Sequence, residues 1–265
     1  MTNGTDSAGV PRDRNMIGRV SIVTGGASGI GRAVAVRLAA MGSSVVIVDS
    51  NRDGADAAAS GIVSSGGKAF SVTADVCRRG DVEQMVAEAA ALGPVDALVH
   101  SAGIGIERPF LETTAKEWSR IIETDLTGTF LCCQAVASHM AANGYGRIVN
   151  LASTAGIRGG TGRAAYGAAK GGVIALTKVM AVELAPFGIT VNALDPGAIE
   201  TELVKRMHSE NTRVVYRRGI PADRYGTPEE VAAVAAFLVT EEARYVTGQI
   251  LGVDGGFLAA GVMSR

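Results

Sequence analysis

Thr24-Gly-Gly-Ala-Ser-Gly-Ile-Gly31 is the stretch that decides the fold of this 265-residue chain. An apolar, β-rich run at 20–24 leads into it, and a run of helical period at 30–41 follows. Glycines permit a tight turn between such a strand and helix, and they let backbone N–H groups and the positive helix end approach a pyrophosphate. The stretch therefore predicts a dinucleotide site.

Strand-like runs and segments of helical period alternate along the rest of the chain. We expect further strands at 44–49, 69–72, 97–100, 147–152, 190–193 and 249–253, and helices at 55–65, 81–92, 127–142, 164–184 and 228–240. This alternation is typical of repeated βαβ units. It predicts a single α/β domain, residues 17–265, built on a doubly wound parallel sheet of seven strands with helices on both faces.

Two segments fall outside this alternation. Residues 1–16 are too polar to bury the apolar area that would offset their ordering entropy, so we interpret them as a flexible leader. Residues from about 198 to 226 form a looser, polar segment. Long insertions of this kind in compact domains are usually functional, and we interpret this one as a substrate lid.

Composition argues against several classes of protein. The chain carries 25 Lys and Arg against 26 Asp and Glu, a balance that gives no general attraction to nucleic acid or to an acidic membrane. It has no apolar run of about 20 residues and no signal-peptide pattern, so we expect a cytoplasmic protein. Cys77, Cys132 and Cys133 predict free thiols, and the three histidines lack ligand spacing, so we expect no metal site.

Asp49 ends the second expected strand, 18 residues after Gly31. A carboxylate there can accept hydrogen bonds from both hydroxyls of an adenosine ribose, and it would repel a 2′-phosphate. The position favours NAD over NADP. Arg32 and Arg52 are the basic side chains that could instead bind the 2′-phosphate of NADP. The other alternative is that Asp49 is only a turn residue.

Tyr166 and Lys170 lie one helical turn apart in the helix expected at 164–184. A tyrosine hydroxyl ordinarily titrates at about pH 10, too high for an efficient base at neutral pH, but a neighbouring ammonium favours the phenolate. Ser153 follows the strand expected at 147–152, at the sheet edge where doubly wound folds bind ligands. Together the three residues predict proton transfer coupled to dinucleotide chemistry.

On these motifs the chain resembles the short-chain dehydrogenase/reductase family, of Rossmann-like fold, over residues 17–257. The family's Thr-Gly-x-x-x-Gly-x-Gly matches 24–31, its Tyr-x-x-x-Lys matches 166–170, and its serine matches Ser153. The resemblance implies hydride transfer between a secondary alcohol carbon and a nicotinamide, with Tyr166 exchanging a proton with the substrate oxygen, Ser153 orienting that oxygen and Lys170 assisting the tyrosine. It also implies a homotetramer or homodimer. The cofactor residues that we expect are Gly25, Ser28, Gly29, Ile30, Gly31, Asp49, Asp75, Val76, Ala102, Gly103, Tyr166, Lys170, Pro196, Gly197, Ile199 and Thr201.

The chain departs from the family pattern at two places. Asp125 stands in Asp-Leu-Thr-Gly where the family usually has Asn, and His100-Ser-Ala-Gly103 stands for Asn-Asn-Ala-Gly. The family's Asn acts chiefly through its main-chain carbonyl, so we assign Asp125 to the catalytic set. Its carboxylate could instead pair with Lys170 and weaken the effect of that lysine on Tyr166. We interpret His100 and Ser101 as ties between neighbouring strands.

The substrate is less well defined by the sequence. Ile106, Ile157 and Gly159 are expected in the pocket wall and suggest a partly apolar alcohol or ketone, and Arg213 and Arg217 in the lid could steer an anionic group into it. The family's acyl-carrier branch has arginines at places that read Asn-Gly-Tyr-Gly and Ala-Pro-Phe here, at 143–146 and 185–187. An NADPH-linked carbonyl or 3-oxoacyl reductase is one alternative. A non-catalytic dinucleotide-binding protein, with Asp125 marking lost chemistry, is the other.

Overall fold

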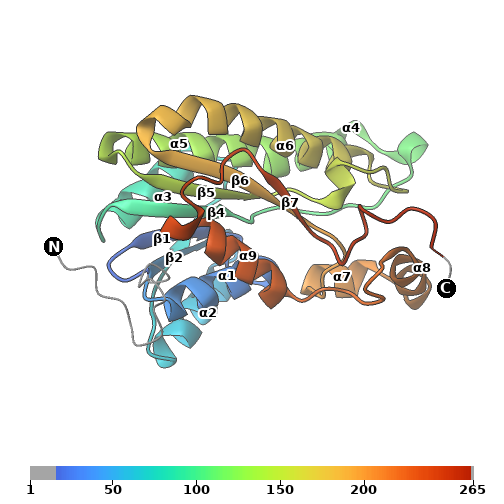
Figure 1. Cartoon of the computed structure of the whole chain (residues 1–265), viewed down its shortest axis with the longest axis horizontal. Coiled ribbons are helices and arrows are strands. Elements are labelled where there is room, and N and C mark those ends of the chain that lie inside the picture. Colours follow the sequence, from blue (N-terminus) through green and yellow to red (C-terminus); the bar gives the residue numbers. More distant parts are fainter. Residues whose placement is uncertain (1–15, 264–265) are drawn as a thin grey trace.

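The computed structural model describes residues 16–263 and has one seven-stranded sheet with helices on both faces (Figure 1). Its strand order is β3-β2-β1-β4-β5-β6-β7, and all neighbouring pairs are parallel. This confirms the predicted doubly wound, Rossmann-like α/β sheet. The strands are β1 (Val20–Thr24), β2 (Ser44–Asp49), β3 (Lys68–Thr73), β4 (Val95–His100), β5 (Gly146–Leu151), β6 (Ile189–Pro196) and β7 (Ile250–Val253).

The sheet is wound in both directions from β1. The chain runs outward through β2 to β3, and it then crosses to the other side of β1 and continues from β4 to β7. Loops leaving the carboxyl ends of β1 and β4 therefore diverge, and a crevice forms between them. His100 links the two strands below this crevice, since its Nδ1 lies 3.0 Å from Oγ1 of Thr24.

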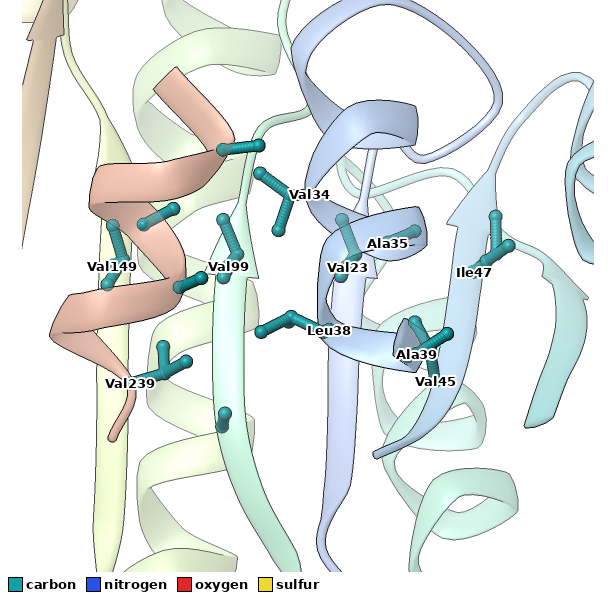
Figure 2. Packing of buried hydrophobic residues seen from close by; sticks show 14 of the residues in the cluster. Val23, Val34, Ala35, Leu38, Ala39, Val45, Ile47, Val99, Val149 and Val239 are labelled. Carbon is teal, nitrogen blue, oxygen red and sulfur yellow. The ribbon is translucent and has the colours of Figure 1, made fainter. Parts of the chain in front are cut away.

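Small apolar residues let the helices pack closely against the sheet. On one face α1 (Gly29–Ala40) lies between α2 (Arg52–Ser64) and α9 (Pro228–Leu238), and Figure 2 shows Val34 and Leu38 of α1 among Val23, Val99 and Val239. On the other face α3 (Arg79–Ala90), α5 (Gly128–Asn143) and α6 (Ala164–Leu184) bury a second apolar cluster. Burial of this apolar surface is the main term that stabilises the fold.

Two helical regions differ from the sequence prediction. Helix α4 (Ala115–Ile121) and a π-helical turn (Ile122–Thr127) precede α5, where we expected the helix to begin at 127. The 198–226 segment contains α7 (Glu202–Met207) and α8 (Glu210–Gly219), so the expectation of an irregular segment was wrong. The side chains of Thr201 and Ser209 cap these two helices. The segment is polar because its helices lie beyond the sheet at one end (Figure 1).

The remaining ordered features are short. Met16, which the sequence assigns to the leader, is buried, and its N–H donates to the carbonyl of Met41 at 2.9 Å. The rest of that leader lies outside the described residues.

None of the helices within residues 16–263 has the length and apolar character of a membrane span, and no group of three or more metal-ligand side chains is found there. The 3-10 turns are η2 (Phe110–Glu112), η4 (Thr154–Gly156), η5 (Ala185–Phe187) and η6 (Glu241–Ala243).

Asp195 in β6 is a costly feature of the core. Its side chain is fully buried, and neither carboxyl oxygen has a hydrogen-bond partner in the described part of the chain. Burial raises the pKa of Asp195 to about 6, and Asp254 adds to this effect. The backbone N–H of Ser153 opposes it from nearby, without forming a hydrogen bond of good geometry. Because the folded state holds this proton more tightly than the unfolded state, ionising Asp195 costs folding free energy.

Asp195→Asn is therefore expected to stabilise the protein above pH 6 by about 1–3 kcal/mol, because the amide carries no charge to bury. Near pH 4 the folded protein already has a neutral Asp195, so the gain should nearly vanish. Thermal midpoints of both proteins at pH 8 and pH 4 measure this difference. An equal gain at the two pH values would mean that packing, not ionisation, is the cause.

Candidate active site

A pocket of about 970 Å³ occupies the crevice at the carboxyl ends of the strands. It runs from the end of β2 past the glycine-rich turn to the ends of β5 and β6, and α7 covers part of it. Of the residues singled out in the sequence, the following line it: Gly25, Ser28, Gly29, Ile30, Asp49, Asp75, Val76, Ala102, Gly103, Ile106, Asp125, Ser153, Tyr166, Lys170, Pro196, Gly197, Ile199 and Thr201. Gly31, Ile157, Gly159, Arg213 and Arg217 are not in its lining.

The glycine-rich turn between β1 and α1 is tightly packed, and no Ser28 side-chain bond caps the start of the helix. Gly25 has a φ of +65°, and a Cβ on it would lie 2.8 Å from the backbone nitrogen of Ala102. Gly31 packs directly on the carbonyl of Gly25, so its role is close packing of the turn. The side chain of Ser28 makes no cap hydrogen bond to α1. The N–H groups of the first turn are therefore free of a side-chain cap, as a phosphate-binding helix end requires.

Asp49 lies at one end of the pocket with its carboxylate fixed by the backbone. Its Oδ2 accepts from the N–H of Ala27 at 3.2 Å, and its Oδ1 accepts from the N–H of Asn51 at 3.0 Å. Each oxygen keeps a further lone pair for a ligand hydroxyl. Arg32 does not reach this end, because its guanidinium pairs with Glu202 at 3.3 Å, and Arg52 does not line the pocket.

Ser153, Tyr166 and Lys170 meet at the other end of the pocket. Lys170 is buried, its Nζ donates to the carbonyl of Leu151 at 2.9 Å, and the same nitrogen lies 5.6 Å from the ring centroid of Tyr166. The hydroxyl of Ser153 accepts from the N–H of Ala155 at 3.2 Å, which leaves its proton available for a ligand oxygen. The structure thus places all three side chains in the lining of one pocket.

Asp125 lies in the π-helical turn and is fully buried. Its Oδ1 accepts from the N–H of Ile104 at 2.9 Å, and its Oδ2 lies 3.3 Å from Nζ of Lys170. Its main-chain carbonyl accepts from the hydroxyl of Thr129 at 2.7 Å. The sequence left open whether Asp125 acts through its main-chain carbonyl or pairs with Lys170. In the structure its carboxylate pairs with Lys170.

This pair changes the acidity of both partners. Burial raises the pKa of Asp125 above its ordinary value, and the Lys170 ammonium and the Ile104 N–H reduce that rise without cancelling it. Burial is the largest single influence on Lys170 and lowers its pKa. The Asp125 and Tyr166 charges and the hydrogen bond with Asp125 together outweigh burial and raise this pKa above its ordinary value. Lys170 therefore remains a cation beside Tyr166.

Several lining residues were not assigned to the pocket from the sequence. Three are basic, namely Arg78, Arg120 and Arg206, and others are Cys77, Thr124, Leu203 and Val204. Arg206 lies one turn after Glu202 in α7, so the two residues share a face of that helix. The sequence did not predict this helix and so did not predict the shared face. Cys132 and Cys133 are buried, whereas Cys77 is only half-buried.

Arg213, one of the two lid cations named in the sequence analysis, makes its contacts outside the pocket. Its guanidinium forms a bidentate ion pair with Glu200, at 2.6 and 3.0 Å, and lies 4.9 Å from the ring centroid of Tyr225. Both contacts are within the 198–226 segment. Arg213 therefore stabilises that segment, and it does not face the pocket.

Comparison with known proteins identifies the class of protein. A family model described as "Enoyl-(Acyl carrier protein) reductase" matches residues 25–258. A 3-oxoacyl-[acyl-carrier-protein] reductase of Synechocystis sp. is 41% identical over 91% of this chain and 97% of its own length. An NAD-dependent glycerol dehydrogenase of Listeria innocua is 37% identical over 94% and 97%.

A solved structure gives the same result in three dimensions. It is described as an NAD(P)-dependent gluconate 5-dehydrogenase of Beutenbergia cavernae with NADP bound at low occupancy, and it has a TM-score of 0.89, 37% identity and coverage of 94% of this chain and all of that one. The chain belongs to the short-chain dehydrogenase/reductase family. It is an oxidoreductase that uses a nicotinamide dinucleotide and acts on alcohol or carbonyl groups.

Proposed function

We propose that the protein is an NAD-dependent dehydrogenase that interconverts a secondary alcohol and a ketone. The observation that supports this most strongly is that Ser153, Tyr166 and Lys170 line one pocket whose other end carries Asp49. When bound, the nicotinamide would accept hydride from the alcohol carbon. Asp49 would accept hydrogen bonds from the adenosine ribose, and the capless first turn of α1 would bind the pyrophosphate.

Side chains of the protein itself would carry out the proton transfer. In the oxidation direction Tyr166, as the phenolate, would accept the proton of the substrate hydroxyl, and Ser153 would donate a hydrogen bond to the same oxygen. Lys170, held by Leu151 and Asp125, would stabilise the phenolate with its positive charge. Reduction of a ketone would use the same groups in reverse.

The pocket walls suggest the chemical class of the substrate. Ile104, Ile106, Leu203 and Val204 supply apolar surface next to the catalytic residues. Arg206 also lines the pocket, and within residues 16–263 it has no ion-pair partner. We therefore propose an alcohol with an apolar body, with Arg206 in place of Arg213 and Arg217 as the side chain that would receive an anionic group.

We propose that the 198–226 segment acts as the lid of this pocket. Helix α7 meets both walls of the crevice: Glu202 pairs with Arg32 of α1, and Met207 packs near Gly105 after β4, so that a Cβ on that glycine would lie 3.3 Å from the Met207 sulfur. We expect α7 to move when the lid opens for a ligand. We also propose that the protein self-associates. Phe130 of α5 and Val182 of α6 are apolar side chains with exposed fractions of 40% and 76%, and a second copy could cover them.

An NADPH-linked 3-oxoacyl reductase is the second candidate, favoured by the 41% identity to the Synechocystis enzyme. Two observations weigh against it. The Asp49 carboxylate sits where a 2′-phosphate would be repelled. Near the start of β5, Arg147 is buried, and its guanidinium lies 4.3 Å from the ring centroid of Tyr145, so it offers no charge to an acidic carrier protein.

The function is tested by following NAD and NADP reduction with a panel of secondary alcohols, each neutral alcohol paired with a carboxylate-bearing analogue. We expect turnover with NAD, and a lower KM for the carboxylate member of a productive pair. Turnover with NADP alone would support the second candidate. Cofactor binding without turnover across the panel would support a non-catalytic dinucleotide-binding protein.

Asp49→Ala is expected to reverse the cofactor preference in part. Loss of the carboxylate removes hydrogen bonds to the ribose hydroxyls and the repulsion of a 2′-phosphate, so kcat/KM should fall about 10-fold or more with NAD and rise with NADP. Steady-state kinetics with both cofactors measures the change. Asp53→Ala, at the start of α2 and outside the pocket, is the matched control. A uniform loss with both cofactors would contradict the assignment.

A further inference from the structure

Tyr166 has a second cation beside it that neither the motifs nor the family match points out. Arg163 directly precedes α6, and its guanidinium carbon lies 5.7 Å from the ring centroid of Tyr166, almost the same distance as Nζ of Lys170. The Arg163 side chain is only 15% exposed, so solvent screens its charge weakly. Its Nη2 lies 3.7 Å from a carboxylate oxygen of Glu107.

The same guanidinium is held by the lid. Nη2 of Arg163 lies 3.4 Å from Nε2 of His208, the residue directly after α7. His208 is buried, its ring stacks on Tyr216 of α8 at 4.7 Å, and its Nδ1 lies 2.9 Å from the hydroxyl oxygen of Tyr225. One ring therefore connects α7, α8 and the chain before α9 to a residue at the start of the catalytic helix.

The chemistry of the contact defines the protonation state of His208. A guanidinium can only donate, so Nε2 must be the acceptor, and the ring proton is then on Nδ1 and is donated to Tyr225. Burial lowers the pKa of His208, the positive charges of Arg163 and Arg213 lower it further, and Glu107 and Glu200 act in the opposite direction. The neutral ring that this contact needs is thus the form favoured at neutral pH.

We propose that Arg163 is a positioning residue that couples the closed lid to the acid–base tyrosine: with α7 seated, His208 holds the guanidinium over Tyr166, where its charge stabilises the phenolate. When the lid opens, Arg163 loses this acceptor, and Glu107 remains its ion-pair partner. The phenolate is then most populated when the lid is closed over the pocket. The inference rests on the proposed role of Tyr166 as the base.

The charged groups around the phenol set the sign of the effect. Lys170 faces Tyr166 from the same helix, and Arg163 faces it from the residue directly before that helix. Asp125, in the π-helical turn, offsets part of the Lys170 charge. Removing Arg163 removes positive charge and makes the phenolate harder to form. In the oxidation direction the acidic limb of the kcat/KM profile should therefore move to higher pH.

Arg163→Gln is expected to move this limb upward by about half to one pH unit, and Arg163→Lys, which keeps the charge, by less. The ultraviolet titration of tyrosinate in the protein without cofactor, taken as the difference from Tyr166→Phe, should shift in the same direction. Arg108→Gln is the matched control, because Arg108 pairs with Glu117 outside the pocket. An unmoved limb and titration in Arg163→Gln, with normal turnover, would overturn the inference and leave the proposed function intact.

The part played by the lid is tested with His208→Phe, which keeps a ring to stack on Tyr216 and removes the acceptor. We expect a shift in the same direction as in Arg163→Gln. The double variant should shift no further than Arg163→Gln alone, because both changes break one connection. Additive shifts would overturn the coupling. Absence of turnover in the unaltered protein would instead contradict the proposed function.

Discussion

Tyr166→Phe should reduce turnover by at least about a hundredfold and leave the dinucleotide bound. The substitution removes one hydroxyl that lines the pocket, and the ring still packs in the apolar cluster with Ile121, Ala165 and Ala169. A positioned general acid–base group contributes about 10²–10⁴-fold to a rate, so kcat should fall by that factor. Because the phenol contributes little to cofactor affinity in comparison with the glycine-rich turn and Asp49, the Kd for NAD should change less than threefold.

The measurement combines steady-state oxidation of the best alcohol with calorimetric titration of NAD. Tyr245→Phe is the matched control, since this tyrosine is 99% exposed and lies outside the pocket. Turnover should be unchanged there. If Tyr166→Phe kept more than a tenth of the activity, another group would have to act as the base.

The elements that position this site could be predicted from the sequence because their causes are local. Alternation of apolar residues and glycine placement determine β1, α1 and the end of β2, and so they place Gly25 and Asp49. The spacing of Tyr166 and Lys170 in one helix determines that the two share a face. Ser153 could be placed because it lies two residues after Leu151, where β5 ends.

The features that the sequence did not predict depend on contacts between residues that are far apart in the chain or lie on the surface. The charge of Arg213 suggested a ligand, but its partner is Glu200, which charge alone does not reveal. Arg163 and His208 are 45 residues apart and meet only because the fold brings the end of α7 close to the start of α6. The π-helical turn that carries Asp125 joins α4 to α5 without a break in the sequence that would predict it.

Lys170→Met is expected to cost both activity and stability, for separable reasons. Activity falls because Tyr166 loses the cation that favours its phenolate. Stability falls because Asp125 is left buried without a counter-charge, a loss of about 3–5 kcal/mol for a broken buried pair. Thermal midpoints and kcat, measured on the same preparations, follow the two effects.

The stability loss should depend on pH. Burial raises the pKa of Asp125 in the folded state above its ordinary value, and loss of the ammonium can only raise it further. Protonation therefore removes the buried charge as the pH falls, and the folded state binds the proton more tightly than the unfolded state. Lys170→Met should be much less stable than the unaltered protein at pH 8 and closer to it at pH 5.

Asp125→Asn separates the two roles of the pair. The double variant Lys170→Met/Asp125→Asn has no buried charge and should regain most of the lost stability at pH 8, yet remain as inactive as Lys170→Met. Asp125→Asn alone should stay active, and its acidic limb should move to lower pH because the Lys170 charge is no longer offset. If the double variant were as unstable as Lys170→Met, packing of the lysine side chain, not its charge, would account for the loss. If Asp125→Asn were inactive, the carboxylate itself would be part of the acid–base chemistry.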